Sequence, residues 1–237
     1  QAVADVSDPA WLEILVADIR DDPDHLGIFL DDVNFHQWVA TADGTPTWPR
    51  GWTADDWRHR VADLVESLRA EFPGRTIVHN TQPFRTDYGN GDVQRAVTAS
   101  DLQFWEFGWT STAVDGAEAM RDQIAAAQRI HELGRGIVHM ASDPDRVEVE
   151  RNLVGYLLTN DGSDAVGDAG TEWWGGDELW EWYALDLGAA RNEVYEESPG
   201  LFVRDFERGS AVMNWSGEPV TWGEATIRHG RAQVNWR

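Results

Sequence analysis

The sequence predicts an α/β fold of the (β/α)8 TIM-barrel type, followed by a small antiparallel β appendage. Short apolar runs alternate along the chain with longer segments of helical periodicity. Within each run the apolar residues are continuous, as expected for strands buried on both faces of a parallel sheet. A polar residue follows nearly every run, at the position where the carboxyl end of a barrel strand carries its functional groups.

The first elements follow from local signals. A helix is expected over 9–20, because Pro suits the first helical position and apolar residues recur every three or four positions. Residues 27–30 (Gly-Ile-Phe-Leu) predict a buried strand. After a loop rich in Trp, Pro and Gly, Thr53 is placed to cap a second helix, which Phe72-Pro73-Gly74 would end.

The same cycle then repeats along the chain. Further strands are predicted at 76–78, 102–105 and 136–138, with weaker candidates at 4–6 and 164–166. Helices are predicted at 93–99, at 116–133 and from Asp143-Pro144 to Leu158. Antiparallel strands joined by short turns are predicted at 201–206, 210–215 and 225–228.

The barrel is favoured over an open doubly wound sheet, because no Gly-rich phosphate loop follows any strand. The strand count falls short of the eight that a complete barrel needs. We therefore expect residues 1–183 to form strands three or four to eight, roughly the C-terminal two-thirds of a barrel. Residues 184–237 are expected to form the β appendage.

The charge is strongly one-sided. The chain has 42 Asp and Glu residues against 19 Lys and Arg, all of them Arg, and its net charge is −23. Such a surface repels polyanions and excludes a general nucleic-acid binder. Adaptation to high salt and a coding bias against Lys both explain it, and both are preferred to a function of the charge itself.

The composition excludes other classes of protein. Hydrophobic residues make up 42% of the chain and 14 residues are Trp, which excludes a disordered protein. No apolar run approaches the roughly 18 residues that span a bilayer, so no membrane span is expected. The chain has no Cys, and therefore no disulfide, thiol nucleophile or Cys-bound metal. The sequence does not predict the oligomeric state.

Two acidic residues carry the sharpest chemical signal. Asp31 and Glu106 each follow a predicted buried strand, and parallel barrel strands all end on one face. Two carboxylates facing each other there suit glycosidic bond cleavage, with one as general acid and the other as nucleophile or base. The aromatic residues around Glu106 are expected to raise its pKa. The alternative is that these acids cap strand-to-helix loops, which for Asp32 is equally well supported.

Further polar residues follow neighbouring strands. Asp32, Asn34, His79, Asn80 and His139 are candidates for binding sugar hydroxyls or supporting a catalytic carboxylate, although each alone is equally consistent with a satisfied rim residue. The chain lacks H-x-H and H-E-x-x-H spacing, so neither a metal nor another cofactor is expected. The acidic turn at 160–164 lacks the calcium-loop pattern.

Tryptophans supply candidate stacking surfaces for sugars. Trp38, Trp109 and Trp173 are the ones taken as substrate-binding candidates, and Trp48 and Trp52 lie in the same loop as Trp38. Tryptophans at helical spacing, namely 11, 57 and 182, are expected to pack in the core instead.

Several short motifs resemble a known family. Residues 4–11, 27–33 and 105–106 resemble the hypothetical glycosyl hydrolases with a barrel fold, which are distantly related to endo-polygalactosaminidase-type enzymes. Residues 186–188 and 200–214 are similar to the closing hairpin of that family. The resemblance covers nearly the whole chain, although each motif is short.

The resemblance implies a (β/α)8 barrel in which Asp31 is the strand-four acid and Glu106 the strand-six acid. By analogy with related barrels, Asp31 would be the nucleophile and Glu106 the proton donor. Two departures from the family remain, since the first barrel strands have no counterpart and Asp32 competes with Asp31.

The expected function is therefore cleavage of a polysaccharide or oligosaccharide, and retention of the anomeric configuration is favoured. The expected location is extracellular or at the cell surface. The alternative is a non-catalytic carbohydrate-binding or structural surface protein that keeps the barrel fold. A barrel enzyme for phosphorylated metabolites is disfavoured, because the chain has neither Lys nor a Gly-rich phosphate loop.

Overall fold

The computed structural model describes residues 8–21, 26–36, 48, 51–142, 145–168 and 181–236. The chain divides into two compact units. Unit 1 comprises Gln1–Phe104 and Arg129–Gly136, and unit 2 comprises Trp105–Gln128 and Ile137–Arg237. Among the described residues, no helix is both long and apolar enough to cross a membrane.

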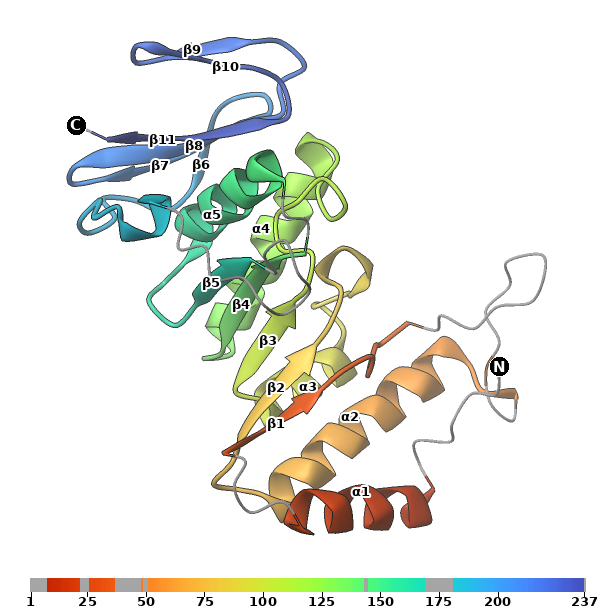
Figure 1. Ribbon diagram of the computed structural model, residues 1–237. Coiled ribbons are helices and arrows are strands. Elements are labelled where there is room, and N and C mark those ends of the chain that lie inside the picture. The colour runs from red at the N-terminus through yellow and green to blue at the C-terminus, as the bar shows by residue number, and fades with distance from the viewer. Residues whose placement is uncertain are drawn as a thin grey trace. The chain divides into compact units, whose positions relative to one another are not determined.

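A five-stranded parallel sheet alternates with helices along the chain (Figure 1). Its strands, in sheet order, are β1 (Gly27–Leu30), β2 (Thr76–Asn80), β3 (Leu102–Trp105), β4 (Gly136–Ala141) and β5 (Ala165–Asp168). The helices are α1 (Pro9–Asp21), α2 (Ala54–Glu71), α3 (Gly91–Ala99), α4 (Ala117–Glu132) and α5 (Arg146–Thr159), with 3₁₀ turns η2 (Pro83–Arg85) and η3 (Glu181–Ala184). This arrangement confirms the predicted fold class, a partial (β/α) barrel followed by antiparallel strands.

Burial of the parallel strands follows the prediction only in part. In β3 and β4, residues on both faces are buried, including Phe104, Trp105 and Ile137. In β1, by contrast, Ile28 and Leu30 are buried while Phe29 is 46% exposed. Successive strand residues point to opposite faces, so Ile28 and Leu30 share the covered face of β1 while Phe29 lies on the other face, with its ring centroid 5.2 Å from that of Phe104.

Helix α2 shows how the local sequence determines its own start. Thr53 Oγ1 accepts from the Asp56 N–H at 3.1 Å, and Asp56 Oδ2 accepts from the Thr53 N–H at 2.8 Å. These reciprocal bonds form a capping box, which satisfies main-chain N–H groups that the first turn leaves unpaired. The hydrogen bonds from the main chain and side chain of Thr53 lower the pKa of Asp56.

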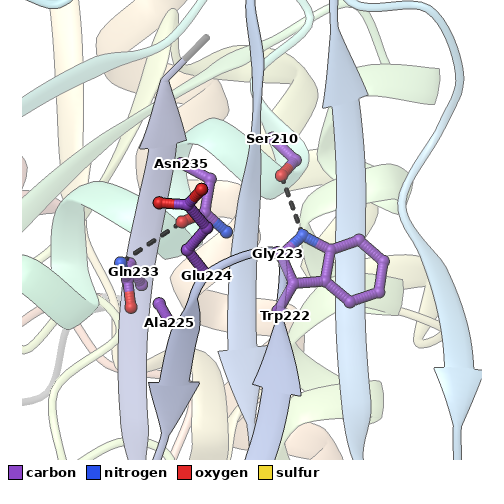
Figure 2. Close-up of a pocket in the computed structure, with 7 residues that line it drawn as sticks. All are labelled: Ser210, Trp222, Gly223, Glu224, Ala225, Gln233 and Asn235. Carbon is purple, nitrogen blue, oxygen red and sulfur yellow. Dashed lines mark hydrogen bonds between the residues drawn. The ribbon is translucent and has the colours of Figure 1, made fainter.

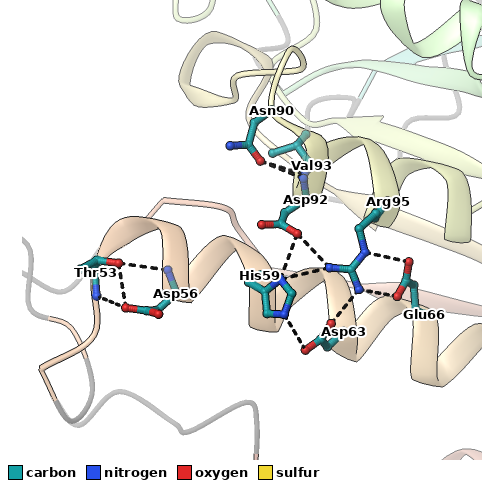
Figure 3. A network of polar contacts seen from close by, with 9 residues as sticks. All are labelled: Thr53, Asp56, His59, Asp63, Glu66, Asn90, Asp92, Val93 and Arg95. Carbon is teal, nitrogen blue, oxygen red and sulfur yellow. Dashed lines mark hydrogen bonds and ion pairs between the residues drawn. The ribbon is translucent and has the colours of Figure 1, made fainter.

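Helix α3 is tied to α2 by a polar network (Figure 3). The Arg95 guanidinium donates to both oxygens of Glu66, at 3.1 and 2.6 Å, and also contacts Asp63 at 2.7 Å and Asp92 at 2.8 Å. His59 lies between Asp63 and Asp92, with its ring nitrogens 3.6 and 3.1 Å from their carboxylates. The hydrogen bonds that Arg95 donates to the Glu66, Asp63 and Asp92 carboxylates raise its pKa. Partial exposure of these groups limits what the network adds to stability.

The C-terminal part of unit 2 consists of antiparallel strands. They are β6 (Tyr195–Ser198), β7 (Leu201–Phe206), β8 (Gly209–Asn214), β9 (Val220–Trp222), β10 (Ala225–Ile227) and β11 (Arg231–Trp236). Four of them form a sheet in the order β11-β8-β7-β6, and β9 pairs with β10 as a separate hairpin.

The four-stranded sheet packs on both faces within unit 2. One face meets α5, where Arg204 Nη1 donates to the Leu157 and Asn160 carbonyls at the end of that helix, at 3.2 and 2.7 Å. Because side chains alternate along a strand, Val203 and Val212 point to the opposite face. There they form a buried cluster with Ile227 of β10. The β9–β10 hairpin therefore covers the face that α5 leaves open.

Element boundaries differ from prediction in a few places. Strand β4 continues past His139 to Ala141. Helix α5 begins at Arg146, and the Asp145 side chain caps it by accepting a hydrogen bond from the Val147 N–H at 2.7 Å. The predicted start at 143–144 and the predicted strand at 4–6 lie outside the described residues. Strands β6, β9 and β11 were not predicted, because their runs are short or carry exposed polar residues. The predicted division at 183/184 stays a prediction.

Candidate active site

Asp31 lies at the carboxyl edge of the sheet with one oxygen fixed. Asn80 Nδ2 donates to Asp31 Oδ1 at 2.8 Å, and the Asp32 N–H donates to the same oxygen at 3.0 Å. The strand register explains the first contact. Leu30 of β1 pairs with His79 of β2, so the residues that follow them, Asp31 and Asn80, lie side by side. Among the described residues, Oδ2 of Asp31 accepts no hydrogen bond, and the residue is exposed.

Asp32 makes the turn that orients its neighbour. Its φ is 55°, the only left-handed value at a described non-glycine residue. Such a conformation costs about 1 kcal/mol and is tolerated best by Asp and Asn. The turn directs the Asp32 N–H onto the Asp31 carboxylate, while Asp32 itself stays exposed.

Asn34 and His79 hold the loop that follows Asp31. Asn34 is 4% exposed, and its carbonyl accepts from Trp57 Nε1 of α2 at 2.8 Å. His79 is fully buried, and burial lowers its pKa to about 4 although the hydrogen bond to Val33 opposes this. The ring is therefore neutral at pH 7, and its Nε2–H donates to the Val33 carbonyl at 2.6 Å. Both residues thus position the segment that carries Asp31.

Glu106 follows β3 and belongs to unit 2. Its carbonyl accepts from the hydroxyl of Ser142, which follows β4 in the same way. Glu106 is half-buried. Ser142 was not predicted, although the signal that identified Asp31, a polar residue directly after an apolar strand, would have found it had β4 been extended to Ala141.

Trp109 and His139 lie inside a buried polar cluster of unit 2. Both are 0% exposed, and Trp109 Nε1 donates to His139 Nδ1 at 3.0 Å. His139 Nε2 lies 3.4 Å from Asp164 Oδ2, which requires the proton on Nε2. Asn152 completes the cluster, because its Oδ1 accepts from the Trp109 N–H and its Nδ2 donates to the His139 carbonyl, both at 3.1 Å.

This burial bears on the predicted roles of Trp109 and His139. Neither ring has surface exposed to solvent, and each ring nitrogen lies within hydrogen-bonding distance of a protein group. The geometry makes them supports for the loop after Glu106, and their direct contact with a sugar stays a prediction. The ring of Trp109 leaves no room at Gly155 of α5, where a Cβ would lie 1.9 Å from Trp109 Cγ.

The loop tryptophans are only partly described. Trp38 and Trp173 lie outside the described residues. Trp48 and Trp52 lie with their ring centroids 6.2 and 6.4 Å from that of Trp57, and Arg60 lies 4.3 Å above the Trp52 ring. These contacts gather three indoles at the start of α2, in the part of the chain that follows Asp31.

The predicted residues therefore fall into separate groups. Asp31, Asp32 and Asn80 are brought together at the edge of unit 1, and Trp109 and His139 are brought together within unit 2. Because Asp31 belongs to one unit and Glu106 to the other, the separation of their carboxyl groups stays a prediction.

Comparison with known proteins gives the family. A family model described as hypothetical glycosyl hydrolase family 15 matches residues 3–210, so the chain belongs to that family, as its motifs predict. No curated protein gives a significant match.

Among solved structures, the chain is similar to the glycoside hydrolase domain of PelA from Pseudomonas aeruginosa, with 19% sequence identity and a TM-score of 0.44. The aligned region covers 70% of this chain and 64% of the PelA domain. It is also similar to an α-amylase from Anoxybacillus, with 15% identity and a TM-score of 0.41 over 97% of this chain and 61% of that one. The chain spans less than two thirds of the length of each.

Proposed function

We propose that this protein is a glycoside hydrolase that cleaves a polysaccharide or oligosaccharide with Asp31 and Glu106 as its two catalytic carboxylates. Membership of the glycosyl hydrolase family supports the reaction class. The observation that carries the assignment of Asp31 is its carboxylate, exposed at the end of β1 with Oδ1 held by two donors. A nucleophile needs this combination of a fixed orientation and an accessible second oxygen.

The proposed reaction has two steps. Glu106, protonated, donates its proton to the glycosidic oxygen while Asp31 Oδ2 attacks the anomeric carbon, so the glycosidic bond breaks and a glycosyl ester forms. Glu106, now a carboxylate, then removes a proton from water, whose oxygen attacks the same carbon and releases Asp31. Two inversions at one carbon leave its configuration unchanged.

The neighbours of Asp31 have a distinct role in this proposal. The Asn80 amide and the Asp32 N–H hold Oδ1, which leaves Oδ2 to make the bond to the sugar. Both donors stabilise the charge of the free carboxylate, and they fix the plane in which it approaches the substrate. The proposal predicts a separation of about 5–5.5 Å between the two carboxyl groups, as in retaining enzymes.

The net charge of −23 indicates which substrates to test first. A polyanionic glycan would be repelled at low salt, whereas neutral and amino-sugar polymers would not. A panel of soluble glucans, chitosan and polygalacturonate, each at low and high salt, covers these classes.

Release of reducing ends from this panel tests the proposal, with Asp31→Asn, Glu106→Gln and Asp32→Asn compared with the wild type. Asp31→Asn and Glu106→Gln should lose activity by about 10³-fold or more, and Asp32→Asn should retain most of it. With a dinitrophenyl glycoside of the cleaved sugar, whose leaving group needs no proton, Glu106→Gln should recover activity in the first step and Asp31→Asn should not.

The configuration of the first product, followed by proton NMR of the anomeric hydrogen, distinguishes retention from inversion. Activity that survives both Asp31→Asn and Glu106→Gln would overturn the assignment of the carboxylates. Glycan binding without release of reducing ends, unchanged by Glu106→Gln, would instead support a non-catalytic carbohydrate-binding protein.

A further inference from the structure

A pocket of about 730 Å³ lies on the C-terminal sheet of unit 2, and its lining includes no residue assigned above to catalysis (Figure 2). It is lined by Ser210, Trp222, Gly223, Glu224, Ala225, Gln233 and Asn235. These residues come from β8, β11 and the β9–β10 hairpin. The volume lies within the range of pockets that hold small organic ligands.

The pocket forms because of strand register. Ser210 of β8 pairs with Asn235 of β11, and Gln233 lies two residues before Asn235 on the same strand, so the three side chains share one face of the sheet. The β9–β10 hairpin packs over this face, and its two-residue turn at Gly223-Glu224 ends beside them. Gly223 has a φ of 61°, as the first turn position of a tight hairpin requires.

Trp222 is held in a fixed orientation at one side of the pocket. Its Nε1–H donates to Ser210 Oγ at 3.0 Å, and its ring packs against the buried cluster that includes Val203, Val212 and Ile227. The side chain remains half-buried and lines the pocket. A ring already immobilised loses little further conformational entropy when a ligand stacks on it.

The polar groups opposite Trp222 are incompletely satisfied. Asn235 Oδ1 accepts from Gln233 Nε2 at 3.2 Å, but among the described residues no group accepts from the buried Asn235 Nδ2. In the view of Figure 2 this nitrogen lies on the Trp222 side of the pocket. A buried donor without an acceptor costs about 1–3 kcal/mol. Because Asn235 Nδ2 has almost no solvent-accessible surface, a small rotation of the amide toward the pocket would let a ligand oxygen accept from it.

The lining selects the chemistry of the ligand. None of the seven lining residues in the described part of the chain is cationic, and Glu224 adds a carboxylate, so phosphate and other anions are disfavoured. The side-chain amides and the carboxylate offer both donors and acceptors, which suits a ligand bearing several hydroxyl groups. One apolar indole face suits a ligand that also presents C–H groups in a plane, because the ring face is electron-rich.

We propose that this pocket is a carbohydrate-binding site for a short stretch of an uncharged glycan, separate from the catalytic carboxylates. A pyranose ring stacks on Trp222, and its hydroxyl groups accept from Asn235 Nδ2 and donate to Glu224. The inference concerns a site that the proposed hydrolysis does not need, so either can fail without the other.

NMR titration of the whole chain with maltohexaose, cellohexaose, chitohexaose and hexagalacturonate tests the proposal. The indole ¹H–¹⁵N signal of Trp222, assigned by its loss in Trp222→Phe, should shift with at least one neutral hexasaccharide and not with hexagalacturonate. For that hexasaccharide, Asn235→Ala and Glu224→Ala should each raise Kd about tenfold. Glu218→Ala, an exposed acid in the turn before β9, is the matched control and should leave Kd unchanged.

Two comparisons keep this site distinct from the active site. Glu106→Gln should bind the hexasaccharide as tightly as the wild type, and Glu224→Ala should leave hydrolysis of a small chromogenic glycoside unchanged. The proposal is overturned if no neutral hexasaccharide shifts the Trp222 signal, if only hexagalacturonate does, or if Glu218→Ala weakens binding as much as Glu224→Ala.

Discussion

The contact between Gly155 and Trp109 allows a sharp test of packing in unit 2. Gly155 lies within α5, where glycine is normally unfavourable, and Ala would gain up to about 1 kcal/mol in helix propensity. A Cβ at this position, however, would lie 1.9 Å from Trp109 Cγ and 2.3 Å from both Cδ atoms. Propensity and packing therefore predict opposite signs for Gly155→Ala.

Packing should dominate, because the ring has nowhere to move. Trp109 is held through Nε1 by His139 and through its main-chain N–H by Asn152, and the Trp105 ring lies edge-on at 5.9 Å. Overpacking a rigid core costs about 1–3 kcal/mol and sometimes more. An approach of 1.9 Å places this cost at the upper end, about 3 kcal/mol, so after the gain in propensity we expect Gly155→Ala to lower the free energy of unfolding by about 2 kcal/mol. For a chain of this size that corresponds to a fall in Tm of about 4–8 °C.

Urea unfolding and differential scanning calorimetry measure this change. Gly91→Ala is the matched control, since Gly91 is the first residue of α3 and no atom of another described segment lies within 4 Å of the point that its Cβ would occupy. Its stability should stay within about 0.5 kcal/mol of the wild type. In a Trp109→Ala background, Gly155→Ala should cost nothing, because the atoms it meets are gone. An equal loss in both backgrounds would refute the packing argument.

Three further predictions concern single side chains. Because His79 has a pKa of about 4 when folded and 6.5 when unfolded, its contribution to stability is complete above pH 6.5 and is lost as the pH falls toward 4. By urea unfolding, the wild type should therefore lose about 2 kcal/mol more than His79→Gln between pH 7 and 5; equal losses would contradict the burial of a neutral ring. Thr53→Ala should destabilise the chain by about 1 kcal/mol and Thr53→Ser by less than half of that, and an unchanged Thr53→Ala would show that the capping box with Asp56 is not needed. If Asp31 is the nucleophile, Asn80→Ala should lower kcat by about 10- to 100-fold with little change in KM, whereas a change in KM alone would assign Asn80 to substrate binding.

Local signals in the sequence predicted the framework well. Strand β1 was predicted over the residues it occupies, and α2 begins after Thr53 as its capping pattern requires. Such signals act within one turn or one run of residues, where the chain meets only its own neighbours. The same reasoning placed Asp31 and Asn80 after neighbouring strands, and parallel pairing then brought them into contact.

Tertiary structure decided which polar residues face inward. His79 and Asn80 are adjacent in sequence, yet one is a fully buried support and the other holds the Asp31 carboxylate. His139 was expected at a strand end, but β4 continues for two residues and encloses it beside Trp109. Because β4 runs two residues past His139, that side chain lies within the strand and not at its exposed end, so an error of two residues in a boundary changes what a side chain contacts.

The pocket beside Trp222 is the clearest case of a feature that only the folded chain possesses. Ser210, Trp222 and Asn235 share no motif, and none stands out in the sequence from the other polar and aromatic residues. Their meeting depends on the register between β8 and β11 and on the hairpin that packs over both. The sequence by itself determined the helices, the parallel strands and the acids that follow them, but not the strands β6, β9 and β11. Long-range pairing decided the rest, because contacts between distant residues depend on the packing of the whole unit.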